Sequence, residues 1–356
     1  MKDLELTSKH KSIGAKIVDY AGFNMPVQYE GVITEHLSVR NNAGVFDVSH
    51  MGEIFVNGDE ADNFLQFITS NDISKLYPGK VQYSCLPNNN GGIVDDILVY
   101  KISDSSFMLV VNASNIEKDF NWLNENNTFN CEIINDSSKY SLLALQGPNS
   151  LIILNEVFNV DLSSLEYYCF LKCDLLEIKD VIVSRTGYTG ELGYELYIQN
   201  KDALKLWDYL FSSKHEVKPI GLAARNTLRL EKGFCLYGND IDDTTSPLEA
   251  GLGWITKFST KFINSDFFIE QNKIGLDKKL VGFEVIGKGI ARQHYQVFNY
   301  NNENIGVVTS GSMSPSLNKA IGMAYVMINE TQVENKILIK VRNKYIDAKI
   351  VNLPFL

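Results

Sequence analysis

Two adjacent carboxylates follow a double glycine in the segment Gly91-Gly92-Ile93-Val94-Asp95-Asp96-Ile97. Because side chains alternate along a strand, Asp96 shares one face with the apolar Val94, while Asp95 shares the other face with Ile97. Either way an acid lies in an apolar setting, which costs energy unless it is paired or has a chemical role. Two explanations stay open: a functional carboxylate, or one Asp capping the turn and the other in solvent.

Three glycines in the segment Ser184–Glu195, at positions 187, 190 and 193, imitate a phosphate-binding loop. The spacing matches neither G-x-G-x-x-G nor G-x-x-x-x-G-K-[ST], and the residues that follow predict a strand. Since no helix N-terminus is expected there to hold a pyrophosphate, we reject a nucleotide site and expect a tight hairpin. Glu195, between Tyr194 and Leu196 on the exit strand, is the acid of this segment that most needs a partner.

Two arginines, Arg225 and Arg229, stand four residues apart in the segment Ile220–Gly233 and therefore share one face of an expected helix. An arginine in such a helix is usually paired with a neighbouring acid, here Glu231. An arginine that points into a cleft can instead bind a carboxylate with both arms of its planar guanidinium. Both alternatives stay open from the sequence.

His50 stands close to Asp47 and Ser49 in the sequence and suggests a Ser-His-Asp triad. Three residues packed within four positions do not easily converge as a nucleophile, a base and an orienting acid. The chain also has no G-x-S-x-G elbow. A capping or hydrogen-bonding role is the better interpretation of His50.

These segments require an α+β fold to position them, because strand-like and helix-like runs alternate irregularly along the chain. The expected strands are Glu53–Val56, Val81–Leu86, Ile93–Lys101, Phe107–Asn112, Leu175–Ser184 and Gly193–Ile198. A helix at Lys201–Ser213 is expected to bury Leu204, Trp207 and Phe211. From about Leu280, short β-rich runs alternate with turn residues, which predicts a small antiparallel barrel after a boundary near residues 272–280.

Composition limits the class of protein. The 356 residues, 45% hydrophobic and 21% charged, are ample for two or three domains with buried cores. A formal net charge of -10 argues against nucleic acid or an anionic membrane as the main ligand. The 5 cysteines are odd in number and no histidine follows them at metal-ligand spacing, so we expect reduced thiols and no metal site. No apolar run approaches the ~20 residues of a membrane helix, so a soluble, cytoplasmic protein is expected.

Several characteristic stretches occur in order along nearly the whole chain. They are Gly22–Tyr29, Gly44–Glu53, Gly91–Asp96, Val111–Asn115, Leu145–Pro148, Ser184–Glu195, Gly221–Glu231 and Leu236–Asp240. Together they resemble the T-protein family of the glycine cleavage system, the aminomethyltransferases. One such stretch is weak evidence, whereas all of them in order are strong evidence.

The resemblance implies an α+β, three-domain ring, or cloverleaf, with antiparallel sheets and a C-terminal β-barrel. In this family folate enters a central channel from one side and a lipoyl arm enters from the other. The implied domains are a discontinuous folate-binding domain of residues 1–52 and 139–275, an inserted α+β domain of residues 53–138 that carries the catalytic Asp, and a barrel of residues 276–356.

The resemblance also implies the residues of the site. Asp96 is the implied catalytic acid. The residues implied around the folate are Met51, Tyr83, Tyr100, Asn112, Tyr188, Glu195 and Arg225. A pterin is flat and rich in hydrogen-bonding groups, so Tyr100 or Tyr188 can pack on it while Glu195 accepts from its N–H groups.

The implied reaction moves the one-carbon unit of an aminomethyl group from a lipoylated carrier, the H-protein, to tetrahydrofolate. The products are methylenetetrahydrofolate, ammonia and the dihydrolipoyl-protein. Tetrahydrofolate is the acceptor substrate, and no metal, flavin or nicotinamide is expected. Asp96 would stabilise the cation that develops on the transferred carbon and orient the attacking folate nitrogen.

Two alternative functions have the same fold. One is a folate-dependent demethylase, whose substrate choice depends on the channel rather than on a motif. The other is a non-catalytic folate-binding factor for iron–sulfur cluster maturation, which carries a Lys-Gly-Cys segment. Here the segment reads Lys232-Gly233-Phe234-Cys235, with the cysteine displaced by one. Asp96 and the helix of Arg225 favour the enzyme.

The sequence departs from the family pattern at two places. Phe55 replaces the smaller aliphatic residue that is common in the family, and the tail that often follows the final Leu-Pro-Phe is expected to be missing or replaced.

Overall fold

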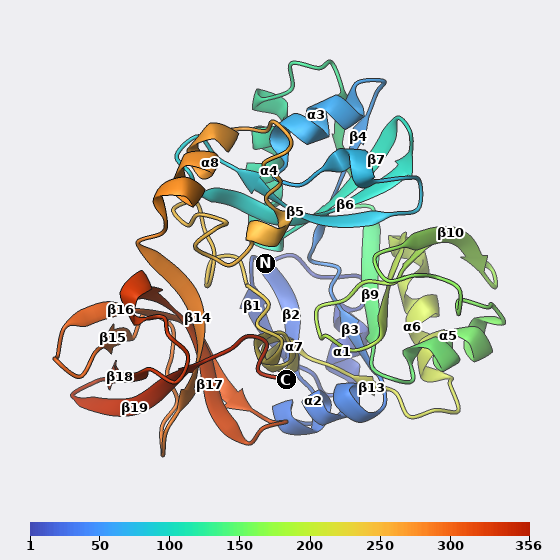
Figure 1. The fold of residues 1–356 in the computed structure, drawn as a ribbon. Coiled ribbons are helices and arrows are strands. Elements are labelled where there is room, and N and C mark those ends of the chain that lie inside the picture. The colour runs from blue at the N-terminus through green and yellow to red at the C-terminus, as the bar shows by residue number, and fades with distance from the viewer. The chain divides into compact units, whose positions relative to one another are not determined.

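The computed structural model describes residues 1–356 and combines helices with mainly antiparallel sheets (Figure 1). The chain divides into two compact units. Unit 1 comprises Met1–Leu65, Ile73–Tyr83 and Ile97–Asn226, and unit 2 comprises Gln66–Asp72, Ser84–Asp96 and Thr227–Leu356. The predicted α+β class is confirmed. The three domains expected from the resemblance, with boundaries at residues 52, 138 and 275, stay a prediction.

The larger sheet of unit 1 has the strand order β10-β11-β12-β9-β3-β13. Its strands are β3 (Gly44–Asp47), β9 (Tyr140–Gln146), β10 (Phe170–Leu175), β11 (Ile178–Ser184), β12 (Gly193–Gln199) and β13 (Lys218–Pro219). Neighbours are antiparallel except β13 and β3, which are parallel. The expected strand Leu175–Ser184 is wrong at its start, because Leu176 adopts a positive φ of 53° in the turn between β10 and β11.

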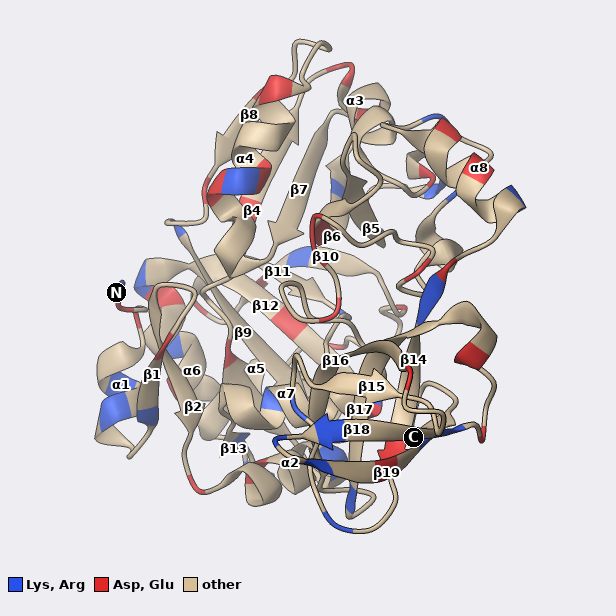
Figure 2. Ribbon diagram, turned by 90° about the vertical axis from the view of Figure 1, so that its left-hand side faces the viewer, with Lys and Arg blue, Asp and Glu red and all other residues tan.

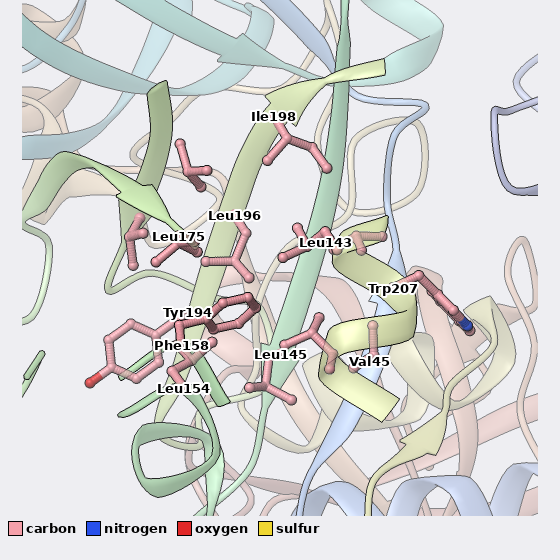
Figure 3. Packing of buried hydrophobic residues seen from close by; sticks show 14 of the residues in the cluster. Val45, Leu143, Leu145, Leu154, Phe158, Leu175, Tyr194, Leu196, Ile198 and Trp207 are labelled. Atoms are coloured by element: carbon pink, nitrogen blue, oxygen red, sulfur yellow. The ribbon is translucent and has the colours of Figure 1, made fainter. Parts of the chain in front are cut away.

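Helices α5 (Ser150–Phe158) and α6 (Ala203–Phe211) pack on this sheet and complete its hydrophobic core (Figure 3). The buried side chains of α6 are Ala203, Leu206, Trp207 and Leu210, whose spacing places them on one helix face. The expected burial of Leu204 is wrong, since this side chain is 51% exposed. The apolar face is centred on Leu206 and Leu210 instead, and Trp207 lies in it as expected.

A second sheet has the strand order β5-β6-β7-β4-β8. Its strands are β4 (Gly52–Asn57), β5 (Val81–Pro87), β6 (Ile93–Ser103), β7 (Ser106–Val111) and β8 (Glu132–Asn135), and helices α3 (Ala61–Ile68) and α4 (Ile116–Glu125) belong to the same part of the chain. The four strands expected here are therefore confirmed. Strand β5 passes from unit 1 to unit 2 after Tyr83, and β6 passes back after Asp96.

The remaining elements of unit 1 are at the N-terminal end of the chain. They are α1 (Thr7–Ser12), α2 (Val32–Asn41) and the pair β1 (Lys16–Tyr20) and β2 (Phe23–Gln28). Helix α7 (Leu222–Glu231) begins in unit 1 and continues into unit 2 after Asn226. It confirms the helix expected around Arg225 and Arg229.

Unit 2 ends in a closed barrel with the strand order β14-β17-β16-β15-β18-β19. The strands are β14 (Lys278–Val285), β15 (Gln296–Phe298), β16 (Asn304–Ser314), β17 (Lys319–Met327), β18 (Lys336–Val341) and β19 (Lys344–Val351), and α8 (Ser265–Ile274) precedes them. Alternating apolar side chains such as Phe283, Val297 and Ile339 fill its interior. The predicted C-terminal barrel is confirmed; the sequence did not indicate β15, which has only 3 residues.

Charged residues of both signs are scattered over the elements of each unit (Figure 2). The hairpin β18–β19 is predominantly basic, because its two strands carry one acid, Asp347, and four lysines: Lys336, Lys340, Lys344 and Lys349. The chain therefore has a locally basic surface despite its net charge of -10. None of the helices is both long enough and apolar enough to cross a membrane.

Candidate functional site

Unit 1 contains a pocket with about 220 Å³ of empty volume and a mixed polar and apolar wall. Its lining residues are Phe46, Val48, Ala144, Gln146, Tyr188, Thr189, Glu195 and Arg225. The structure thus brings together three of the predicted site residues, Tyr188, Glu195 and Arg225. This volume includes open solvent, so the lining side chains and not the volume indicate what the pocket binds.

Arg225 and Tyr188 form a stacked pair in the wall of this pocket. The guanidinium carbon of Arg225 lies 4.3 Å from the centroid of the Tyr188 ring. Arg40 and Arg229 are each paired with a carboxylate, whereas Arg225 has none within ion-pair distance. The alternative in which Arg225 is neutralised by a neighbouring acid is therefore wrong, and its N–H groups are available to an anionic or carbonyl-bearing ligand.

The start of α7, which carries Arg225, is fixed by a buried acid. Glu35 on α2 is 1% exposed, and its Oε2 accepts a 2.7 Å hydrogen bond from the backbone N–H of Gly221. Its Oε1 accepts from the N–H groups of Tyr29 and Gly31 at 2.8 and 3.0 Å. Position 221 requires glycine, because a Cβ atom there would lie 2.3 Å from the backbone of Val27. One carboxylate therefore ties the segment 29–35 to the start of α7.

The turn that carries Tyr188 is wrapped around the side chain of Gln146, at the end of β9. The amide nitrogen of Gln146 donates to the carbonyl of Thr186 at 3.2 Å, and its oxygen accepts from the hydroxyl of Thr189 at 2.9 Å. A Cβ at Gly187 or Gly193 would lie 2.0 or 2.3 Å from this amide. Two of the three glycines that imitate a phosphate loop therefore make room for Gln146.

Glu195 on β12 is 9% exposed and faces the pocket. Its Oε2 accepts a 2.5 Å hydrogen bond from the hydroxyl of Thr186, and its Oε1 accepts none from the protein. Burial raises the pKa of Glu195, while the Thr186 hydrogen bond and the charge of Arg225 oppose that rise. Thr186 is thus the partner that the sequence could not name, and one carboxylate oxygen remains for a ligand.

Tyr100 lies next to Glu195 through a cluster of hydroxyl groups. Its OH is 3.1 Å from the hydroxyl of Ser184, 3.3 Å from that of Thr186 and 2.9 Å from that of Tyr197. The side chain is fully buried, and burial raises the pKa of its phenol. Since Phe170 and Tyr197 already contact its ring, Tyr100 supports Glu195 in this structure, and its packing against a pterin stays a prediction.

His50 is buried and makes an edge contact with the ring of Tyr20. The hydrogen-bonding role expected of it is wrong for Nδ1, which has no partner. Burial, helped by the charge of Arg225, lowers the pKa of His50 to about 3, so the ring is neutral. Asp47 instead accepts from Ser49 at 2.6 Å and lies 2.8 Å from Nε2 of His10. Asp47 and Ser49 are therefore joined to His10 and not to His50.

Besides Tyr100, four predicted site residues do not line the pocket. Met51 follows β3, Tyr83 lies on β5 and Asn112 follows β7, all three half-buried in unit 1. Asp96 is half-buried on β6 in the part of that strand that belongs to unit 2, whereas its neighbour Asp95 is fully buried. The roles of these four residues stay predictions.

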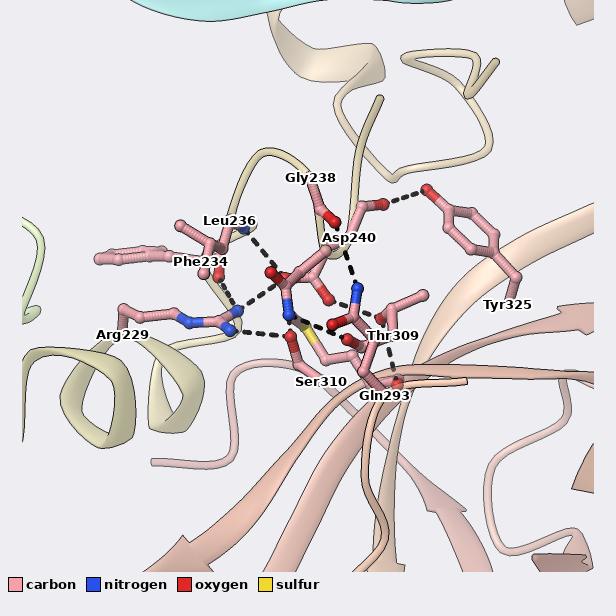
Figure 4. A network of polar contacts seen from close by, with 11 residues as sticks. Arg229, Phe234, Leu236, Gly238, Asp240, Gln293, Thr309, Ser310 and Tyr325 are labelled. Atoms are coloured by element: carbon pink, nitrogen blue, oxygen red, sulfur yellow. Dashed lines mark hydrogen bonds and ion pairs between the residues drawn. The ribbon is translucent and has the colours of Figure 1, made fainter. Parts of the chain in front are cut away.

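Arg229 has a different environment from Arg225, although one helix carries both. It is 1% exposed and donates from Nη1 to Asp240 at 2.6 Å and from Nη2 to Ser310 at 2.7 Å (Figure 4). Arg229 thus forms an ion pair with Asp240, whereas Glu231 accepts from the hydroxyls of Ser314 and Ser316. Arg229 is therefore a structural residue of unit 2.

Comparison with known proteins decides the family. The model of the GCVT N-terminal domain matches residues 6–260, and the model of the glycine cleavage T-protein C-terminal barrel domain matches residues 278–356. The chain belongs to the glycine cleavage T-protein family. The resemblance inferred from the sequence is thereby confirmed.

Curated and solved T-protein relatives match along their whole length. The chain is similar to an aminomethyltransferase of Flavobacterium psychrophilum, with 53% identity over 357 residues that cover 100% of this chain and 99% of the relative. It is 50% identical over 359 residues to one of Bacteroides fragilis, with the same coverage. The crystal structure of the glycine cleavage system aminomethyltransferase T from Bartonella henselae matches with a TM-score of 0.94 at 34% identity, covering 100% of this chain and 98% of that one.

The sequence did not indicate two polar residues of this T-protein pocket, Gln146 and Thr189, nor Thr186 beneath it. Gln146 is the polar side chain at the end of the apolar run Leu142–Leu145, and a buried polar group on such a strand needs a partner. The sequence therefore indicates that Gln146 needs hydrogen-bond partners. It does not indicate which residues they are, because Thr186 and Thr189 lie on a turn 40 or more residues away along the chain.

Proposed function

We propose that the chain is the aminomethyltransferase of glycine cleavage, which transfers a one-carbon unit from an aminomethyl group on a lipoylated carrier protein to tetrahydrofolate. The observation that carries the proposal is the pocket in which Arg225, without an acidic partner, stacks on Tyr188 beside Glu195. The full-length relatives named aminomethyltransferase favour this function over a demethylase or a non-catalytic folate-binding factor.

The side chains of the pocket fit one end of a folate. Tyr188 supplies a flat aromatic surface, and the free Oε1 of Glu195 can accept from ring or amino N–H groups. Arg225 offers N–H donors to a carbonyl or carboxylate oxygen. Met51, Tyr83, Tyr100 and Asn112 complete the proposed folate contacts.

In the proposed reaction the aminomethyl carbon leaves sulfur and nitrogen and becomes bonded to two folate nitrogens. The two hydrogens that those nitrogens lose go to ammonia and to the lipoyl thiol, so that atoms balance. Asp96 is the proposed catalytic acid, whose carboxylate stabilises the positive charge that develops on the transferred carbon and orients the attacking nitrogen. Its half-buried place on β6 suits both tasks, since a carboxylate with little water around it acts strongly on a nearby charge.

The H-protein of the glycine cleavage system is the proposed donor of the aminomethyl group. No metal, flavin or nicotinamide is part of the proposal. The cytoplasmic location expected from the cysteine content stays a prediction.

The test measures methylenetetrahydrofolate and ammonia formed from tetrahydrofolate and a lipoylated carrier loaded with the aminomethyl group. Asp96→Asn should lower kcat by ~100-fold or more while the dissociation constant for tetrahydrofolate changes little, because the charge acts mainly in the transition state. Asp104→Asn is the matched control, since that side chain is 94% exposed. Folate binding without turnover in the wild type would favour the alternatives, and no folate binding would refute the proposal.

A further inference from the structure

Two segments of unit 2 that are far apart in the sequence are bound to one another next to Asp96. They are the 88–96 segment, which runs from the turn after β5 to Asp96, and the 234–243 loop that follows α7. Asn88 donates from its side chain to the carbonyl of Asp243 at 2.8 Å. The N–H of Ile93 donates to the carbonyl of Asp242 at 3.1 Å, and the hydroxyl of Tyr237 donates to the carbonyl of Ile93 at 3.0 Å. Both backbone polar groups of Ile93 are therefore held by the loop.

The double glycine that precedes Asp96 makes this approach possible. A Cβ at Gly92 would lie 1.8 Å from the carbonyl oxygen of Asp243, closer than any real contact. Gly91 has a φ of +87°, and a Cβ there would lie 2.3 Å from the ring of Phe267. The sequence suggested that these glycines form a turn. The structure shows in addition that Gly92 is needed because another backbone lies against it.

The 234–243 loop is itself anchored to the barrel through a buried ion pair. Asp240 accepts from Arg229 at 2.6 Å, from the N–H of Leu236 at 2.9 Å and from the hydroxyl of Thr309 at 2.5 Å (Figure 4). Tyr325 donates to its carbonyl at 2.8 Å. Thr309 lies on β16 and Tyr325 on β17. Because Arg229 and Asp240 are each 1% exposed, solvent hardly weakens the pair, and the loop has little freedom relative to the barrel strands.

We propose that Tyr237 is a positioning residue for Asp96. Its hydroxyl holds the carbonyl of Ile93, three residues before Asp96, so that the barrel determines through the 234–243 loop where the Asp96 carboxylate lies during aminomethyl transfer. This inference rests on the proposed function. A reacting group that moves by ~1 Å can lose ~100-fold in rate, so one hydrogen bond that fixes the backbone of β6 is enough to matter.

The surroundings of Tyr237 keep its hydroxyl protonated, so that it remains a hydrogen-bond donor. Burial raises the pKa of this phenol, and the nearby carboxylates of Asp243 and Asp95 and a hydrogen bond with Asp243 raise it further. Tyr237 therefore keeps its proton, and its hydroxyl interacts with both the carbonyl of Ile93 and the carboxylate of Asp243. Replacement by phenylalanine removes only the hydroxyl and keeps the ring.

The first test compares full-length Tyr237→Phe with the wild type in the aminomethyl-transfer assay. We expect kcat to fall about tenfold, while KM and the dissociation constant for tetrahydrofolate stay within about twofold. Tyr300→Phe is the matched control, because it removes a donating tyrosine hydroxyl too, here one that binds Asp347 on the outside of the barrel. Hydrogen exchange of the 88–96 segment should become faster in Tyr237→Phe and not in Tyr300→Phe. Unchanged kcat, or a rise in KM alone, would overturn the inference.

The second test separates this inference from the proposed function. If Tyr237 acts through Asp96, the double variant Tyr237→Phe/Asp96→Asn should be no slower than Asp96→Asn alone. A further tenfold loss in the double variant, with the large effect of Asp96→Asn intact, would refute the positioning role and leave the proposed function standing. Wild-type turnover of Asp96→Asn would refute the proposed function and this inference with it.

Discussion

Acidification from pH 7 to pH 5 should destabilise unit 1 through one buried side chain, His50. This imidazole is 3% exposed, its Nδ1 has no hydrogen-bond partner, and Arg225 lies near enough for its charge to oppose protonation. In the folded protein the pKa of His50 is lowered from its ordinary value of 6.5 to about 3. The unfolded chain binds a proton at this position below pH 6.5, whereas the folded protein does not.

The sign and size of the effect follow from this difference. Between pH 6.5 and pH 3 the unfolded state binds more protons than the folded state, so the free energy of unfolding rises with pH in that window and is lost as the pH falls. Each pH unit fully inside the window is worth about 1.4 kcal/mol. Most of the interval between pH 7 and pH 5 lies in the window, and integration gives a loss of about 2 kcal/mol from His50 alone.

Urea unfolding at the two pH values measures this loss. A Trp254→Phe background leaves Trp122 and Trp207 as the fluorophores, both in unit 1, so that fluorescence reports on the unit that contains His50. The difference in unfolding free energy between pH 7 and pH 5 should be about 2 kcal/mol smaller in His50→Gln than in the parent. His215→Gln, a change at the surface beside Glu156, should behave as the parent. Parallel pH dependences of the parent and His50→Gln would refute the reasoning.

Three other substitutions test the pocket and the core. Arg225→Lys keeps the charge but loses the planar stack on Tyr188, so the calorimetric dissociation constant for tetrahydrofolate should rise about tenfold; an unchanged constant would contradict the proposed contact. Gln146→Leu leaves the carbonyl of Thr186 without its side-chain donor and should cost about 1–3 kcal/mol in urea unfolding, whereas full stability would show that water replaces the amide. Trp207→Ala should cost about 3–5 kcal/mol in the same assay, because the indole is buried among the side chains of α6 and the sheet; a loss below about 1 kcal/mol would contradict that packing.

Local patterns predicted those parts of the fold that depend on neighbours in the sequence. The strands on either side of Gly91–Gly92 and the hairpin before Glu195 were predicted because alternation and glycine turns are properties of a few consecutive residues. The helix of Arg225 was predicted for the same reason. These elements carry most of the candidate site, so its existence could be inferred before the structure.

Partnerships between distant segments could not be predicted in the same way. The sequence suggested Glu231 as a partner for Arg229. The structure pairs Arg229 with Asp240, which lies on a loop whose course depends on the barrel. Likewise the spacing predicts Leu204 on the apolar face of this helix, and only the packing of α6 on the sheet shows that Leu206 and Leu210 form that face. The Gln146 amide is the clearest case, since its need for partners was visible and their identity was not.

The interleaving of the two units along the chain has a consequence for synthesis on the ribosome. The segments Gln66–Asp72 and Ser84–Asp96 pack with residues that begin at Thr227, about 130 residues after Asp96. At about 5–20 residues per second, a nascent chain waits roughly 7–26 s before the first of those partners is made. During that interval apolar side chains such as Cys85, Leu86 and Ile93, all fully buried in the finished protein, have no partners from unit 2. The 88–96 segment is thus among the last parts of the chain to reach its final packing, and it exposes apolar side chains until then.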